Sequence, residues 1–302
     1  MTDAERLMRG FIPSLRESPF RIAPERVHEL LAKMGGETWV LEIIDGPANF
    51  EAFPTTKEIE GTYAALLSLW AVAASVRVLS VLTQTAAEMN LSQVVITSGS
   101  PGSVAIELKN AALALIRNEE FSWEHPHLEP DSAADPSSQD GLTNNLFLAA
   151  ASFIVLHECG HLVLGHHAYT ALMHQQEHEA DAWAVSWILD KVPSDMHREF
   201  RTVAICVAFI WIGLVDEVRQ ATSTHPPAAQ RFADAFNSFE NVPMESPALE
   251  ISYYVLKAFF DPTTELSQPD CAKNGFIDQL IVAACQHKRL CSQTSAFSAR
   301  II

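Results

Sequence analysis

Long apolar runs separated by polar stretches dominate the chain and predict buried helices. Leu146–His167 has few polar side chains before its last turns, and a helix that is apolar on all sides is normally buried. Gly61–Ala87 has the same character and also predicts a helix. Helical patterns extend over Ser14–Lys33 near one end of the chain and over Ser246–Leu290 near the other. We therefore expect a core built mainly from helices.

Three shorter segments predict strands. Thr38–Ile44 is rich in β-branched and aromatic residues, and the turn-forming residues Asp45-Gly46-Pro47 end it. Gln93–Thr97 and Val104–Leu108 are the other two, and a segment rich in Gly, Ser and Pro separates them. A few short strands among many helices indicate an α+β fold that is mainly α.

One segment, Glu119–Asn144, is rich in Pro, Ser, Asp and Glu and has no apolar period. Loops of this length are usually functional or mobile, and this one runs directly into the apolar segment that starts at Leu146. We expect the loop to border a functional cleft and to gate access to it. His125 and His127 flank Pro126, which favours a surface loop over a metal site.

Charge and cysteine usage restrict the class of protein. A formal net charge of −17 excludes nucleic-acid binding through a general basic footprint. The acidity either favours basic substrates or simply keeps a chain that is 48% hydrophobic in solution. The five cysteines form no C-x-x-C pair, which favours a reduced, cytoplasmic setting over a disulfide framework.

No segment predicts an integral membrane span or a signal peptide. The uncharged runs Gly61–Val76 and Thr202–Val215 are shorter than the roughly 20 residues that a spanning helix needs. The residues after Met1 lack a basic region followed by an apolar stretch. We therefore expect a soluble protein.

The sequence His157-Glu158-Cys159-Gly160-His161, inside the main apolar helix, is the strongest candidate for chemistry. Histidines at positions i and i+4 share one helical face, so both imidazoles can bind one metal ion. Glu158 is placed to take a proton from water bound to that metal. The alternative is an ordinary core helix whose histidines satisfy each other or the backbone. Cys159 faces away from the histidine pair, which favours a packing role.

A second apolar helix, starting near Glu177, offers the third ligand that a catalytic zinc site needs. Gly165 is a suitable terminator for the first helix, and the linker that follows is long enough for the chain to reverse. Glu177 and Asp181 lie on one face, so Glu177 is the predicted ligand and Asp181 is predicted to accept the free N–H of a ligating histidine. Glu179 points elsewhere, as expected of a solvated acidic helix start. A His₂Glu set favours one Zn²⁺ ion.

A third segment, Ser223–Phe232, completes a resemblance. H-E-x-x-H, then E-x-x-A-D, then T-H-P-P-x-x-x-R is similar to the gluzincin metallopeptidases, and above all to the group of the CaaX prenyl proteases and the heat-shock membrane proteases. These motifs cover about a third of the chain. The resemblance implies a zincin-like fold with an active-site helix, a ligand helix and a small sheet whose edge strand can hold the substrate backbone.

The resemblance also implies a role for each matching residue. It makes Glu158 the general base, and His225 and Arg231 groups of the oxyanion pocket. His225 has an alternative as a turn residue before Pro226, to which local sequence gives equal weight. The resemblance assigns four residues to the metal site, three as ligands and Asp181 as the carboxylate that orients a ligating histidine: His157, His161, Glu177 and Asp181.

The expected absence of a membrane span separates this chain from those membrane proteases. The soluble Lit-type phage-exclusion peptidases are similar in length, in solubility and in the first two motifs. Together these features predict a zinc endopeptidase that hydrolyses a protein or peptide substrate with a metal-activated water. The alternatives are a metallopeptidase-like sensor that cleaves a repressor and a zinc-stabilised regulatory protein without activity. The sequence contains no indication of oligomeric state.

These expectations suggest how the chain is organised. Residues 1–60 are predicted to form an N-terminal α/β lobe packed on the core. Residues 61–245 are predicted to form the zincin-like catalytic region, and residues 246–302 a C-terminal helical segment of the same unit.

Overall fold

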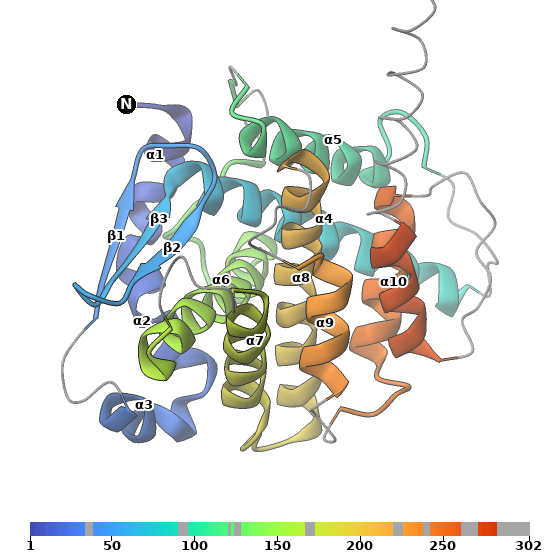
Figure 1. The fold of residues 1–302 in the computed structure, drawn as a ribbon. Coiled ribbons are helices and arrows are strands. Elements are labelled where there is room, and N and C mark those ends of the chain that lie inside the picture. The colour runs from blue at the N-terminus through green and yellow to red at the C-terminus, as the bar shows by residue number, and fades with distance from the viewer. Residues whose placement is uncertain are drawn as a thin grey trace, which may run out of the picture.

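The fold is α+β and mainly α. The computed structural model describes residues 1–33, 39–89, 96–119, 122–123, 128–166, 173–219, 226–237, 242–260 and 271–282. In the view of Figure 1, the three strands lie on one side, α8, α9 and α10 on the other, and α6 and α7 between them. The principal helices are α1 (Asp3–Met8), α2 (Ile12–Ile22), α3 (Val27–Lys33), α4 (Tyr63–Glu88), α5 (Pro101–Ile116), α6 (Gln139–Leu164), α7 (Met173–Leu189), α8 (Asp195–Arg219), α9 (Ala228–Asn237) and α10 (Pro247–Phe260).

The sheet has three strands, β1 (Val40–Ile44), β2 (Phe50–Phe53) and β3 (Glu58–Thr62), in the order β1-β3-β2. β1 runs parallel to β3, and β2 runs antiparallel to β3. Because β3 is central, β2 is an edge strand, and it packs beside α6. The predicted strand at Thr38–Ile44 is confirmed by β1, whereas β2 and β3 were not predicted.

The strand predicted over Val104–Leu108 is wrong, because these residues belong to α5. Ser100 caps this helix by accepting a hydrogen bond from the Ser103 N–H, and Pro101 occupies its first turn. The cap commits the β-branched residues that follow to a helix. Gln93 and its two successors lie outside the described residues, and Ile96 and Thr97 have no regular structure.

The helix predicted over Leu146–His167 is confirmed as α6, but it begins seven residues earlier, at Gln139. Ser138 caps it by accepting from the Gly141 N–H, and Gly165 ends it with φ +68°. The last part of the loop predicted over Glu119–Asn144 is therefore helical.

The described residues of that loop lie beside α1 and the start of α6. Asn144 donates to the Asp131 carbonyl at 2.7 Å, and the Trp123 N–H donates to Asp3. Glu129 forms an ion pair with Arg6 of α1. His125 and His127 lie outside the described residues. These contacts fasten the described part of the loop to the fold.

One buried apolar cluster draws residues from both predicted ends of the chain. Leu15, Leu41, Phe153, Phe209 and Phe276 all belong to it. The helical patterns predicted near both ends are confirmed where the structure describes them, by α2, α3, α10 and a helical segment over 272–282. The boundaries near residues 60 and 245 stay predictions.

Two core helices are long and apolar enough to cross a membrane: Tyr63–Ala86 within α4, and α6. Their most apolar windows are 72% and 78% buried inside the fold. A core helix that is surrounded by other helices is apolar on all sides, as a membrane-spanning helix surrounded by lipid is. The two kinds of helix therefore have the same composition. Length and hydropathy alone are therefore weak support for a span here.

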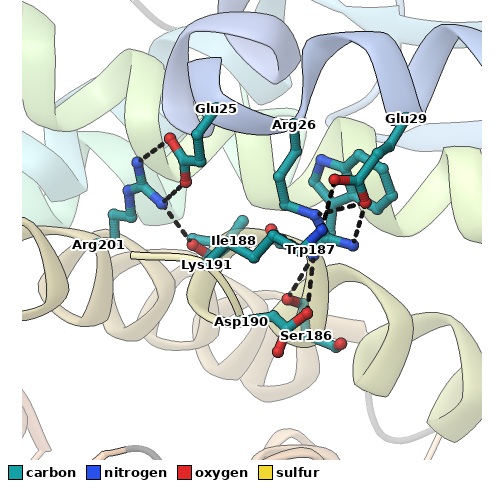
Figure 2. Close-up of polar contacts among 9 residues, drawn as sticks. All are labelled: Glu25, Arg26, Glu29, Ser186, Trp187, Ile188, Asp190, Lys191 and Arg201. Carbon is teal, nitrogen blue, oxygen red and sulfur yellow. Dashed lines mark hydrogen bonds and ion pairs between the residues drawn. The ribbon is translucent and has the colours of Figure 1, made fainter. Parts of the chain in front are cut away.

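Two arginines hold the C-terminal end of α7 (Figure 2). Arg26 donates to the carbonyls of Ser186 and Trp187, and Arg201 donates to the carbonyl of Ile188 at 2.8 Å. These acceptors belong to the last turns of α7, where carbonyls have no partner within the helix. Glu29 and Glu25 neutralise the two guanidinium groups. The α2–α3 region and α8 thereby fix the position of α7.

Candidate metal centre and active-site cleft

The H-E-x-x-H residues lie on the C-terminal part of α6. His157 is 5% exposed and Glu158 is 8% exposed, so both are buried in the fold. The two Nε2 atoms of His157 and His161 lie 3.1 Å apart, with the rings edge to face. The i, i+4 spacing therefore brings both imidazoles to one point, as predicted from the sequence.

The next helix, α7, brings Glu177 to the same point. Its carboxylate oxygens lie 3.4 Å from Nε2 of His161 and 3.5 Å from Nε2 of His157. The approach is close because two small residues meet where the helices cross. A Cβ atom placed on Gly160 would lie 3.2 Å from Cα of Ala180.

These three side chains form a set that can hold a metal ion. One ligand atom from each lies within 4.8 Å of the others. Ligand atoms about 2.1 Å from a tetrahedral ion are about 3.4 Å from each other. The observed separations of 3.1, 3.4 and 3.5 Å are close to this value, and the last two involve different oxygens of Glu177. Two imidazoles and one carboxylate are also the donor set of a catalytic zinc site. The residues therefore fit the predicted group.

Asp181 lies behind the first histidine. It is fully buried, and its Oδ1 is 2.8 Å from Nδ1 of His157. The contact directs the opposite nitrogen of His157 toward Glu177 and His161. Burial opposes a charge on His157, yet Asp181 and Glu177 raise the pKa of this histidine from 6.5 to about 10. The pocket thus favours positive charge at the point where the three ligand atoms meet.

Arg231 of α9 is tied to the same carboxylates. Its Nε and Nη2 donate to Asp181 at 2.7 and 2.9 Å, and its Nη1 lies 3.2 Å from Glu177. Burial raises the pKa of Asp181, but Arg231 and His157 outweigh it and lower the pKa to about 2. The structure therefore places Arg231 as the counter-ion of the carboxylates, and Arg231 also lines the cleft. Its role in the oxyanion pocket stays a prediction.

His225 lies outside the described residues, so the structure does not place it. The description resumes at Pro226 and Pro227, and α9 begins directly afterwards. Asp216 of α8 accepts a hydrogen bond from the Ala228 N–H at 2.7 Å and so caps α9.

His166, which has no predicted role, lies beside His161, and Glu179 contacts His166 in turn. His166 lies with its Nδ1 2.9 Å from Nδ1 of His161, and its Nε2 lies 3.0 Å from Glu179. The prediction that Glu179 points away from the metal is right for direct ligation, but its carboxylate pairs with His166. The sequence signal that could have indicated His166 is its place directly after Gly165, the residue that ends the helix.

The metal ligands open onto a cleft of about 440 Å³. One wall is the edge strand β2 with the residues before it, from Ala48 to Ala52. Apolar side chains of α6 and α8 also line the cleft, among them Phe153, Trp211 and Val215. The Trp211 ring contacts Phe50 of β2, with centroids 6.2 Å apart. None of the described loop residues before α6 lines this cleft, so the prediction that the loop borders it is wrong for that part of the chain.

A half-buried carboxylate, Asp216, also lines the cleft. Burial raises its pKa from 3.8 to about 6, against the lowering effects of the Ala228 N–H and of Arg231. Arg219, one turn further along α8, donates to the Ala48 carbonyl and to Asn49. These contacts tie α8 to the segment that leads into β2.

Comparison with known proteins gives a family and a relative. The sequence model of a family described as Peptidase U49 matches residues 59–252. A protein of Escherichia coli (strain K12) named "Cell death peptidase" is 25% identical over 228 residues, which are 72% of this chain and 77% of that protein. No solved structure matches the chain significantly. The family match begins within the central strand β3, and it includes the helices that carry the candidate metal ligands and Arg231.

Proposed function

Because the chain belongs to the peptidase U49 family, we propose that it is a zinc-dependent endopeptidase. The observation that carries the proposal is the meeting of His157, His161 and Glu177 at the floor of a cleft. Family membership supports the coarser statement that the protein is a peptidase. The donor set supports zinc as the metal.

The proposed mechanism assigns a task to each residue of the site. A zinc ion held by the three ligands would lower the pKa of a bound water and polarise the scissile carbonyl. Glu158 faces the cleft, accepts the proton of the attacking water and passes it to the leaving nitrogen. Asp181 and Arg231 keep His157 and Glu177 in place. His225 remains our proposed partner of the oxyanion, on the strength of the motif alone.

The substrate proposed for this cleft is an extended stretch of protein or peptide. Among the described strands, β2 pairs only with β3, so its other edge can offer backbone groups to a substrate. The residues of that strand line the cleft beside the ligands. A substrate segment paired with β2 would lie across the ligand cluster. The apolar wall at Phe153 and Trp211 would receive a hydrophobic side chain.

We also propose that the protein acts in the cytoplasm. Cys159, Cys206 and Cys271 are free and buried, and the described residues contain no disulfide. Burial in an apolar setting raises the pKa of the Cys206 thiol to about 12, which keeps it protonated and unreactive.

The test of the proposed function is Glu158→Gln. The substitution removes the base but keeps the size of the side chain, so the variant should bind zinc like the wild type. Loss of a general base costs about 10²- to 10⁴-fold in turnover. Zinc content is measured by atomic absorption, and cleavage by mass spectrometry of a digested peptide library.

Glu58→Gln, an exposed substitution on β3, serves as the control and should leave both quantities unchanged. Full turnover by Glu158→Gln would contradict the general-base role. Stoichiometric zinc in the wild type without any cleavage would favour the inactive regulator.

A further inference from the structure

We propose that His166, held by Glu179, is the positioning residue of the second metal ligand, His161. The inference rests on the proposed function, because it assumes that His161 binds a metal ion. It concerns a hydrogen-bonded chain that starts at the ligand His161 and continues outside the ligand set through His166, Glu179 and Gln175. We call this chain the histidine relay.

The end of α6 brings His166 back under its own helix. Gly165 adopts φ +68°, a left-handed conformation that glycine enters without strain. The N–H of His166 then donates to the carbonyl of His161 at 3.0 Å. The two rings meet edge to face, with centroids 5.0 Å apart. His166 is 6% exposed, so its ring is held inside the fold.

The polar contacts of the relay determine where its protons sit. An ionised carboxylate only accepts, so Nε2 of His166 must donate to Glu179 across 3.0 Å. In a neutral imidazole, the other nitrogen is then an acceptor. Nδ1 of His166 therefore accepts the N–H of His161 across 2.9 Å.

The consequence is a defined tautomer of His161. With its proton on Nδ1, the lone pair of Nε2 points toward Glu177 and His157, which is the state that binds a metal. Without an acceptor at His166, the His161 ring loses the contact that selects this tautomer and fixes its rotation. Gln175 donates to Glu179 at 2.7 Å and orients the last carboxylate.

The two histidine ligands are thus supported differently. His157 contacts Asp181, which is fully buried and paired with Arg231. His161 contacts the neutral imidazole of His166. The carboxylate partner of His166 is Glu179, whose side chain is 46% exposed. Water can replace Glu179 as the hydrogen-bond acceptor for His166, because Glu179 is partly exposed. We therefore expect substitution of His166 to have the larger effect on metal affinity.

The test measures zinc affinity by chelator competition in His166→Phe and His166→Gln. Phenylalanine fills the space but cannot accept a hydrogen bond, so affinity should fall about 10- to 100-fold, the usual cost of losing such a partner. The side-chain oxygen of glutamine can accept the His161 N–H, so His166→Gln should recover most of the affinity. The Co²⁺-substituted proteins should show the same order in their visible spectra.

The control is His197→Phe, on the exposed side of α8, which should bind zinc like the wild type. Equal affinity in His166→Phe and wild type would overturn the positioning role. Equal loss in the Phe and Gln variants would also overturn it, because packing alone would then explain the effect. A wild type that binds no stoichiometric zinc would overturn the proposed function as well, which separates the two failures.

A measurement on the wild type does not depend on how the variants fold. Long-range ¹H–¹⁵N spectra of the histidine rings in the zinc-loaded protein report each tautomer. We expect a proton on Nδ1 of His161 and on Nε2 of His166. A proton on Nδ1 of His166 would overturn the relay.

Discussion

At the scale of single residues, the absence of a side chain at Gly160 governs how close the ligand helices come. A Cβ atom there would meet Cα and the carbonyl oxygen of Ala180 at 3.2 and 3.4 Å. Helix backbone gives way less readily than a flexible side chain, so added volume moves α7 and with it Glu177.

We predict that Gly160→Val lowers zinc affinity by at least about tenfold, because a misplaced ligand loses its share of the binding free energy. Gly160→Ala should have a smaller effect in the same direction. Isothermal titration with Zn²⁺ measures both.

Gly213→Ala is the matched control. It also lies in a helix, but among the described residues its Cβ would meet only Leu280, at an ordinary 3.6 Å. It should keep the zinc affinity and raise the free energy of unfolding by about 0.5–1 kcal/mol, since alanine is the better helix former. Wild-type affinity in Gly160→Val would show that the helix crossing does not set the ligand geometry.

Asp216 predicts a pH dependence of stability. Its pKa rises from 3.8 to about 6 on folding, so the folded state binds the proton more tightly than the unfolded state. Its contribution is therefore present at low pH and is lost as pH rises from about 4 to about 6.

Asp216→Asn keeps an acceptor for the Ala228 N–H but does not titrate. Relative to the wild type, its free energy of unfolding should increase by up to about 3 kcal/mol between pH 4 and pH 7. Urea unfolding across that range measures the difference, in which titrations common to both proteins cancel. A difference independent of pH would contradict the raised pKa.

At the scale of elements, α7 is held at both ends by different means. Its first half carries Glu177 and Asp181 in the metal-site network, and its last turn is capped by Arg26 and Arg201. Because the acceptors are backbone carbonyls, the two arginines fix the position of α7 along its own axis.

We predict that Arg201→Met destabilises the protein by about 3 kcal/mol. The substitution leaves Glu25 without its bidentate partner and the Ile188 carbonyl without its donor. Guanidinium chloride unfolding gives the value. Arg21→Met, which removes an exposed ion pair with Glu17, should change stability by less than about 0.5 kcal/mol. Equal effects of the two substitutions would argue against the capping role.

Helices were easier to predict than strands for a physical reason. α6 has a long apolar composition that only a buried helix satisfies, and α5 shows how a local cap overrides the β-branched residues at Val104–Leu108. β2 and β3 are short and rich in Glu, and their pairing depends on contacts across the sheet. Such strands carry little signal of their own.

At the scale of the whole molecule, the candidate metal site joins three helices. Ligands come from α6 and α7, and Arg231 from α9 packs against their carboxylates. A metal ion bound only by the folded state therefore stabilises the entire core.

We predict that zinc at 100 times its dissociation constant adds about 2.7 kcal/mol to the free energy of unfolding. For a chain of this size, that raises the Tm by about 4 °C. Calorimetry with zinc and with chelator measures the shift. Glu177→Ala should show much less of it, and an unchanged Tm in the wild type would contradict a site bound to the folded state.

The sequence alone determined the local chemistry: two histidines and a glutamate on one buried helix, and a second helix with a carboxylate pair. These follow from the 3.6-residue period, which places side chains within a helix without reference to the rest of the chain. Only the tertiary structure decided what surrounds them. It turned Arg231 toward the carboxylates, brought His166 under His161 and set β2 along the cleft, because contacts between distant segments depend on packing that no local pattern encodes.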